Sequence, residues 1–112
     1  MAKRSSWKSK DLLKALHRLG YQLRPGHGDH TKALFIATCA DGSPFKFSFP
    51  VDQGEIPQGT FKAILCQAGG LTEEQLQQAL EGTFMEDDYR EMIAGKSREE
   101  LLKLTLGRRF RR

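Results

Sequence analysis

Residues 31–49 read TKALFIATCADGSPFKFSF, and the fold of this 112-residue chain is built around them. The first part is rich in apolar and β-branched residues and predicts a strand. Asp41-Gly42 is typical of a hairpin turn. The returning strand alternates aromatic and polar residues, in the order Phe45, Lys46, Phe47, Ser48 and Phe49. Alternation puts the three rings on one face, where they need a covering layer of helices.

An amphipathic helix and a short strand are expected on the N-terminal side of this hairpin. Ser9 can cap the helix, and Gly20 can end it in a left-handed conformation. The apolar positions with helical spacing are Leu12, Leu13, Leu16 and Leu19. Residues 21–24 then predict a short strand, and residues 25–29 predict a turn because glycine adopts positive φ at no steric cost.

A second helix is expected on the C-terminal side, after a loop over residues 50–59. Its apolar stripe is Phe61, Ile64, Leu65 and Ala68, and Gly69-Gly70 ends it. The order helix, strand, strand, strand, helix predicts an α+β fold, in which a three-stranded antiparallel sheet carries both helices on one face. Double-stranded-RNA-binding domains have the same α-β-β-β-α order. We treat residues 8–71 as one domain.

The remaining residues predict an acidic helical extension over 72–106 and a basic tail over 107–112. Thr72 with Gln75 resembles a capping box. The apolar positions of the extension include Leu76, Ala79, Met85, Tyr89, Met92, Ile93 and Leu101. Short amphipathic helices must dock on something, either their own domain or a second chain.

The net charge of +4 is unevenly distributed along the chain. Residues 1–32 carry +6, residues 33–70 carry −1, residues 71–106 carry −5 and the last six residues carry +4. Basic ends around an acidic middle favour a polyanionic partner such as RNA. Solvated helix faces with a disordered tail explain the same charges, so charge alone does not separate the two.

The composition, 38% hydrophobic and 29% charged, is that of an ordinary globular domain. No apolar run approaches the roughly 20 residues of a membrane span, and the first residues lack the apolar core of a secretory signal. We therefore expect a cytoplasmic protein without a membrane partner, whose oligomeric state stays open. Cys39 and Cys66 are too few for a disulfide framework, and we expect both to be reduced and buried.

His30 is the strongest candidate for chemistry, because it follows a glycine-rich turn and opens a strand. Imidazole titrates near physiological pH, so it can take a proton from a ribose 2′-hydroxyl or return one to a leaving oxygen. Lys32 is expected on the same face, where it can hold a phosphate, and Gly28 lets a phosphate approach the backbone. A turn histidine bonded locally, beside a lysine that only solvates the strand, is the alternative.

The other candidate residues carry weaker signals. His27 and the two cysteines lack the paired spacing of metal sites, so we expect neither a metal nor a cofactor. His17 is expected at the helix surface, and Trp7 and Tyr21 are expected in the core rather than as base-stacking platforms. The tail, with four arginines around Phe110, can grip phosphates and stack a base, or remain a disordered end.

Three stretches of the chain, in this order, resemble the HicA-type toxins, also called YcfA-like proteins. They are SKDLLKAL at residues 9–16 with Gly20-Tyr21, GDHTK at residues 28–32, and GEIPQGTFKAILCQAG at residues 54–69. The third stretch is the most specific of the three. The resemblance covers about residues 8–71.

This resemblance implies a ribosome-independent endoribonuclease that cleaves messenger RNA on a double-stranded-RNA-binding-like fold, with His30 as the catalytic residue. His30 would act as general acid or base without a metal ion. We assign Gly28, Lys32, Arg24 and Lys46 to RNA binding. A HicB-type antitoxin that covers the site is the protein partner implied by the family.

Two other functions stay open. HicA-type proteins often carry a basic or histidine-containing stretch after the third strand, whereas residues 50–53 here read PVDQ. The missing charge favours a non-catalytic RNA-binding module of the same fold. The acidic extension favours a protein-interaction domain, or an internal mimic of an antitoxin on the RNA face, or a simple enlargement of the core.

Overall fold

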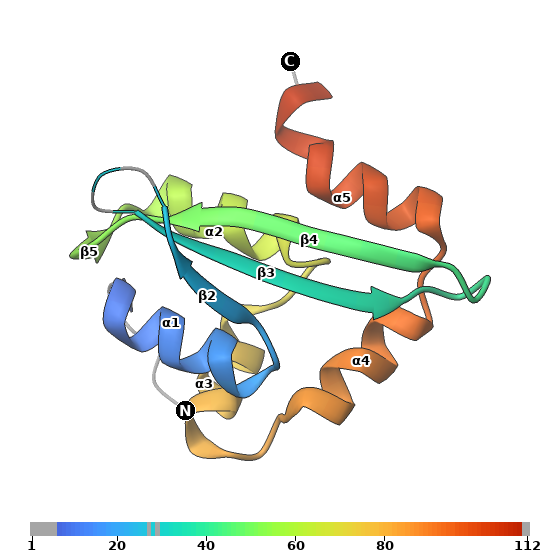
Figure 1. Ribbon diagram of the computed structural model, residues 1–112, viewed down its shortest axis with the longest axis horizontal. Helices are drawn as coiled ribbons and strands as arrows, with labels where there is room; N and C mark the ends of the chain where they lie inside the picture. Colours follow the sequence, from blue (N-terminus) through green and yellow to red (C-terminus); the bar gives the residue numbers. More distant parts are fainter. Residues whose placement is uncertain (1–6, 27, 29, 111–112) are drawn as a thin grey trace.

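The chain forms an α+β fold with a three-stranded antiparallel sheet and a smaller two-stranded one (Figure 1). This computed structural model describes residues 7–26, 28 and 30–110, and the side chains of residues 106–110 lie outside the description. The elements in chain order are β1 (Trp7–Lys8), α1 (Ser9–Arg18), β2 (Gln22–Pro25), β3 (Thr31–Thr38), β4 (Pro44–Val51), β5 (Glu55–Ile56), α2 (Gln58–Gln67), α3 (Glu73–Glu81), α4 (Glu86–Ala94) and α5 (Arg98–Phe110). The predicted α+β class and three-stranded antiparallel sheet are confirmed. None of the described helices is long and apolar enough to cross a membrane.

The larger sheet has the strand order β2-β3-β4 and is covered by helices on one face. Its β3–β4 register is symmetric about Asp41, so that Phe35 lies opposite Phe47. The odd-numbered side chains of β4 are buried and the even-numbered ones exposed. Figure 1 shows α2 behind the sheet and no helix in front of β3 and β4. We call this uncovered side the open face; its side chains are Gln22, Arg24, Lys32, Leu34, Ile36, Thr38, Pro44, Lys46, Ser48 and Pro50.

The covered side of the sheet holds a continuous aromatic layer. The ring centroids of Tyr21 and Phe35 lie 5.0 Å apart, those of Phe35 and Tyr89 lie 4.9 Å apart, and those of Phe45 and Phe47 lie 5.0 Å apart. Such ring pairs stabilise a core by about 0.5–1.5 kcal/mol beyond the burial of their area. Helices α1 and α2 add the buried side chains Leu12, Ala15, Leu16, Phe61 and Ile64.

Trp7 and Tyr21 lie in this core, as expected from the sequence. The Trp7 ring stacks on Phe61 with centroids 5.5 Å apart, and its indole N–H donates to Glu73 at 3.1 Å. Both aromatic side chains are only 2% exposed. Neither ring is available to stack on a base.

The acidic extension packs onto the same core. Helix α3 lies against α1, α4 lies against β3, and α5 lies against α2. Its buried side chains are Leu76, Ala79, Tyr89, Ile93 and Leu101. The predicted capping box at Thr72 is formed, because the Gln75 N–H donates to the Thr72 hydroxyl and the Gln75 side chain accepts from the Thr72 N–H. The described part of the extension thus enlarges the core and leaves Lys32 and Lys46 exposed on the open face.

A buried hydrogen-bond chain ties α4 to the first domain. The Tyr89 hydroxyl donates to the Ala68 carbonyl at 2.7 Å. Because its single proton is used there, it accepts from the Tyr21 hydroxyl, 2.8 Å away. Burial raises the pKa of Tyr21 well above its ordinary value and raises that of Tyr89 as well. Burial therefore favours the neutral form of both hydroxyls.

Three local predictions are wrong. The expected loop over residues 50–59 is partly strand, since β4 runs through Val51 and β5 pairs with β1. Ser9 does not cap α1: it is the first helical residue, and its hydroxyl accepts from the Gly54 N–H at 3.1 Å, which ties the helix start to the β4–β5 connection. Cys39 is buried as expected, but Cys66 is exposed, because it lies on α2 outside the buried stripe of Phe61 and Ile64.

The hairpin turn between β3 and β4 is organised by the Asp41 carboxylate. It accepts from the Ser43 N–H at 2.9 Å, from the Ser43 hydroxyl at 2.6 Å and from the Cys39 thiol at 3.2 Å. The Ser43 hydroxyl is the largest of the causes that lower the pKa of Asp41 to about 2. The turn therefore holds its carboxylate ionised well into the acid range.

Replacing Tyr89 by Phe is expected to destabilise the whole fold. The change leaves the Tyr21 hydroxyl and the Ala68 carbonyl without their buried partner, which costs about 1–3 kcal/mol of unfolding free energy. Urea unfolding at neutral pH measures the loss. Glu91→Gln, on the exposed side of the same helix, should stay within about 0.5 kcal/mol of the natural chain. Equal stabilities of the two variants would contradict the role given to the hydroxyl.

Asp41→Asn is expected to lower stability in a pH-dependent way. The folded-state pKa of Asp41 lies below its ordinary value, so the ionised carboxylate stabilises the fold above that ordinary value of about 3.9. This contribution disappears as the pH falls through about 2. In thermal unfolding, the difference in stability between the natural chain and the variant should be largest above the ordinary pKa of aspartate and should shrink toward pH 2. A gap that stays constant over this window would refute the assignment, and Glu91→Gln serves as the control.

Candidate nucleic-acid interface

The turn between β2 and β3 carries the glycines and the histidine singled out in the sequence. The Gly26 N–H donates to the His30 carbonyl at 3.0 Å and closes the turn. Gly28 has a φ of 60°, a left-handed value that favours glycine. The turn therefore delivers His30 to the start of β3 with its side chain half exposed. His27 and Asp29 lie outside the described residues.

His30 is paired with the carboxylate of Asp52. In the sequence, Asp52 drew attention only as part of residues 50–53, a stretch without positive charge. His30 Nδ1 contacts the Asp52 carboxylate oxygen Oδ1, and the two side chains are 47% and 55% exposed. The contact extends the β3–β4 register by one pair, since Thr31 lies opposite Val51. A carboxylate at Nδ1 stabilises the tautomer that carries its proton there. Nε2 is then left as the acceptor that a general base needs.

Lys32 lies beside His30 on the open face, as the spacing predicted. An open pocket of about 320 Å³ lies between them, lined by Gly26, His30, Lys32, Ser48, Phe49 and Pro50. Lys32 is also opposite Arg24 of β2. A histidine and a lysine therefore share one pocket of the open face, with Arg24 on the neighbouring strand, and a phosphate there could meet both a proton acceptor and positive charge.

Lys46 belongs to the same face but not to this pocket. It lies opposite Ile36, four residues along β3 from Lys32. At 3.2–3.4 Å per residue this is about 13 Å from Lys32. The structure thus brings His30 and Lys32 together in one pocket, and sets Arg24, whose guanidinium donates to Gln22, and Lys46 further along the same surface in a second pocket.

Asp52 is the residue of this site that sequence reasoning did not assign. The signal was present in the hairpin, because His30 and Asp52 are equally far from Asp41, about which the register is symmetric. Extending the ladder beyond its predicted ends would have paired them. The pair was not predicted because residues 50–59 were expected to form a loop.

The other candidates do not join the site. His17 is exposed on α1, as expected, and the tail side chains over 107–112 lie outside the described residues. Among the side chains that the structure describes, no three of His, Cys, Asp or Glu lie close enough together to share a metal ion.

Comparison with family models, with characterised proteins and with solved structures finds no match to this chain. The resemblance noted above therefore depends on its three sequence stretches alone, and function has to be argued from the site.

The His30–Asp52 contact predicts one tautomer of the neutral imidazole. At alkaline pH, two-bond ¹H–¹⁵N correlation spectra should show the His30 proton on Nδ1. Asp52→Ala should move His30 toward the mixture of tautomers found in an unrestrained imidazole. His17, on α1, is the internal control and should not respond to the substitution. An Nε2-protonated His30 in the natural chain would contradict the orientation described here.

Proposed function

We propose that this chain is a cytoplasmic, HicA-like endoribonuclease that cleaves messenger RNA without a metal ion, with His30 as its general acid or base. The observation that carries the proposal is His30 itself: it lies on the open face beside Lys32, and its Nδ1 is held by Asp52. A buried setting would have favoured a structural histidine, whereas His30 is half exposed. The α-β-β-β-α core supports a double-stranded-RNA-binding-like fold as the scaffold.

In the proposed reaction, His30 Nε2 takes the proton of a ribose 2′-hydroxyl. The 2′-oxygen attacks the adjacent phosphorus, the bond to the 5′-oxygen breaks, and a 2′,3′-cyclic phosphate forms. The 5′-oxygen leaves with a proton that the imidazolium or water supplies. Asp52 stabilises the positive imidazolium while it exists, as carboxylates do in histidine dyads.

The cations of the open face have a separate task in this proposal. Lys32 and Arg24 are opposite each other at the His30 end, and their charges stabilise the extra negative charge on the attacked phosphate. Gly28 has no side chain at its own position in the turn, so that the RNA backbone can approach there. Lys46 binds the RNA further along the sheet. A HicB-type antitoxin covering this face remains the proposed protein partner.

A non-catalytic RNA-binding module is the second candidate. It is favoured by residues 50–53, which add Asp52 but no cation on the β4 side of the site. In that case the His30–Asp52 pair would only fasten the end of the hairpin. The two functions differ in whether bound RNA is cut.

His30→Ala is expected to abolish RNA cleavage while the fold is kept. Loss of a general base lowers a rate by about 10²–10⁴-fold. The assay incubates the purified chain with long single-stranded RNA in excess chelator and looks for cyclic-phosphate ends. His17→Ala, an exposed histidine away from the site, should cleave like the natural chain.

The possible outcomes separate the two candidates. Cleavage by the natural chain and by His17→Ala, but not by His30→Ala, supports the ribonuclease. Unchanged cleavage by His30→Ala would overturn its role. Binding without cleavage by the natural chain, with the steep salt dependence of phosphate contacts, would favour the RNA-binding module.

A further inference from the structure

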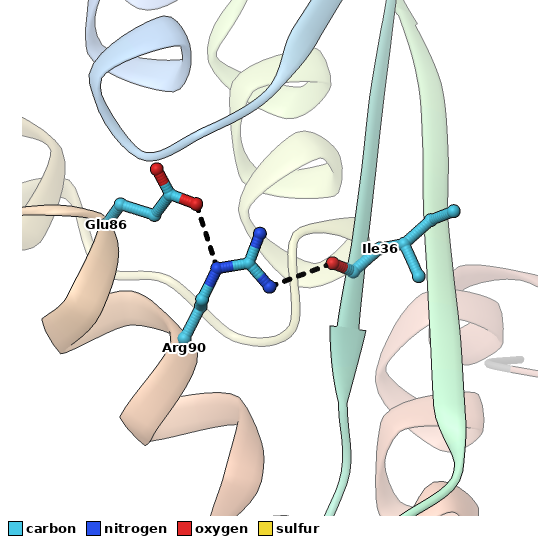
Figure 2. Close-up of polar contacts among 3 residues, drawn as sticks. All are labelled: Ile36, Glu86 and Arg90. Carbon is cyan, nitrogen blue, oxygen red and sulfur yellow. Dashed lines mark hydrogen bonds and ion pairs between the residues drawn. The ribbon is translucent and has the colours of Figure 1, made fainter.

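Helix α4 of the extension lies against the sheet at an edge of β3 that none of the described strands covers. Strand β2 pairs with β3 only as far as Leu34. At the next exposed edge position, the Arg90 guanidinium of α4 donates to the Ile36 carbonyl at 3.1 Å (Figure 2). Glu86 accepts from Arg90 Nε at 2.8 Å, and the guanidinium lies 4.6 Å from the centroid of the Phe35 ring. Arg90 is therefore a cation fixed in place beside the open face.

A second open pocket, of about 380 Å³, lies at this edge. Its lining combines three cations, Arg24, Lys46 and Arg90, with the apolar side chains Leu34 and Ile36. Ile36 is 58% exposed and is the most exposed large apolar side chain of the part that the structure describes. Figure 2 shows this side chain directed away from the guanidinium, so neither group covers the other.

The charge of this pocket is positive. The described residues that line it include three cations and no carboxylate, and Glu86, next to the pocket lining, is paired with Arg90. The bonds to Glu86 and Ile36 engage Nε and Nη1 of Arg90, which leaves Nη2 without a partner among the described residues. Neither Arg24 nor Lys46 has an ion-pair partner within those residues. The pocket therefore offers cations to an incoming anion.

A pocket that combines exposed apolar side chains with cations matches one unit of single-stranded nucleic acid. An unstacked base presents an apolar face, and its flanking phosphates present negative charge. A duplex keeps its bases stacked inside and would leave Leu34 and Ile36 without a partner. An acidic protein could satisfy the cations but gives no reason for the apolar floor between them.

The position of the pocket relative to His30 indicates how a bound RNA strand would run across the sheet. Ile36 lies six residues from His30 along β3, which is about 20 Å at the usual rise of a strand. Lys32 and Leu34 lie between them on the same face. One RNA strand that runs along β3 can therefore occupy both pockets.

We propose that the pocket of Leu34, Ile36, Arg24, Lys46 and Arg90 is a subsite for one nucleotide of a single-stranded RNA whose scissile phosphate lies at His30. Leu34 and Ile36 contact the base, and the cations hold the phosphates on either side of it. The helical extension thereby takes part in RNA binding through Arg90. This inference rests on the proposed RNA function. It adds that the substrate is single-stranded and that a second group of residues binds it.

The test measures RNA affinity of the full chain and of four variants. The probe is a fluorescein-labelled single-stranded RNA with 2′-O-methyl riboses, which cannot be cleaved by 2′-oxygen attack. Ile36→Glu places a negative charge on the apolar floor and should weaken binding about tenfold or more, as loss of a base contact does. Lys46→Gln and Arg90→Gln should each lower the slope of log affinity against log salt by about 0.7. Lys62→Gln, an exposed lysine of α2 outside both pockets, is the matched control.

Stability has to be checked beside affinity, because Arg90 also holds the edge of β3. Ile36 and Lys46 are exposed, so their variants should unfold at the temperature of the natural chain, and they keep the test valid if Arg90→Gln is destabilised. A matching duplex should bind more weakly than the single strand.

Each outcome has one meaning. Weaker binding by Ile36→Glu and Lys46→Gln, with Lys62→Gln unchanged, supports the subsite. Cleavage and binding by the natural chain together with undiminished affinity of both variants would overturn the subsite and leave the ribonuclease intact. Absence of any RNA binding by the natural chain at low salt would overturn both proposals, and an acidic protein ligand would then be the better match to these cations.

Discussion

Phe35 lies opposite Phe47 in the β3–β4 ladder, and this register determines both faces of the sheet at once. Successive side chains of a strand point to opposite faces, so a slip of one residue would carry the phenylalanines into water and the lysines into the core. The Asp41 carboxylate holds the register at the turn. At the other end of the hairpin the same register sets His30 against Asp52. The core and the candidate site therefore have a common physical cause, which is why the hairpin matters more than any single helix.

The extension is the second constraint on the fold. Strand β2 is short and leaves part of the β3 edge without a partner strand, and the extension covers that part. A strand edge without a partner exposes backbone groups that invite unwanted pairing. Beyond β2 this edge is covered by α4, where Arg90 donates to the Ile36 carbonyl, and by the Lys96 carbonyl, which accepts from the Ala40 N–H at 2.8 Å. Tyr89 of the same helix enters the aromatic layer. The described helices after residue 72 thus pack onto the same core as the elements within residues 8–71.

The sequence predicted those parts of the fold that repeat a strong local pattern. The alternation around Phe47 and the turn at Asp41 predicted the hairpin, and helical spacing predicted α1 to α4 and α5 as far as residue 106. The two-residue strands β1 and β5 were missed because strands so short carry no periodicity and depend on a partner far along the chain, as Trp7 and Ile56, 49 residues apart, show. Arg90 was missed for the same reason: a surface arginine on an acidic helix gives no sign of the strand edge it meets.

The candidate site differs from the core in what it contributes to folding. His30 and Asp52 form an exposed pair, and exposed ion pairs stabilise a protein by about 0–1 kcal/mol. Lys32 and Lys46 have no ion-pair partner among the described residues and lie on a face that none of the described helices covers. Folding therefore does not account for this grouping of a histidine, a carboxylate and cations on one surface, whereas binding and cleavage of a polyanion would. It also follows that these side chains can be replaced with little effect on the core, so that lost activity in such variants would report on chemistry rather than on unfolding.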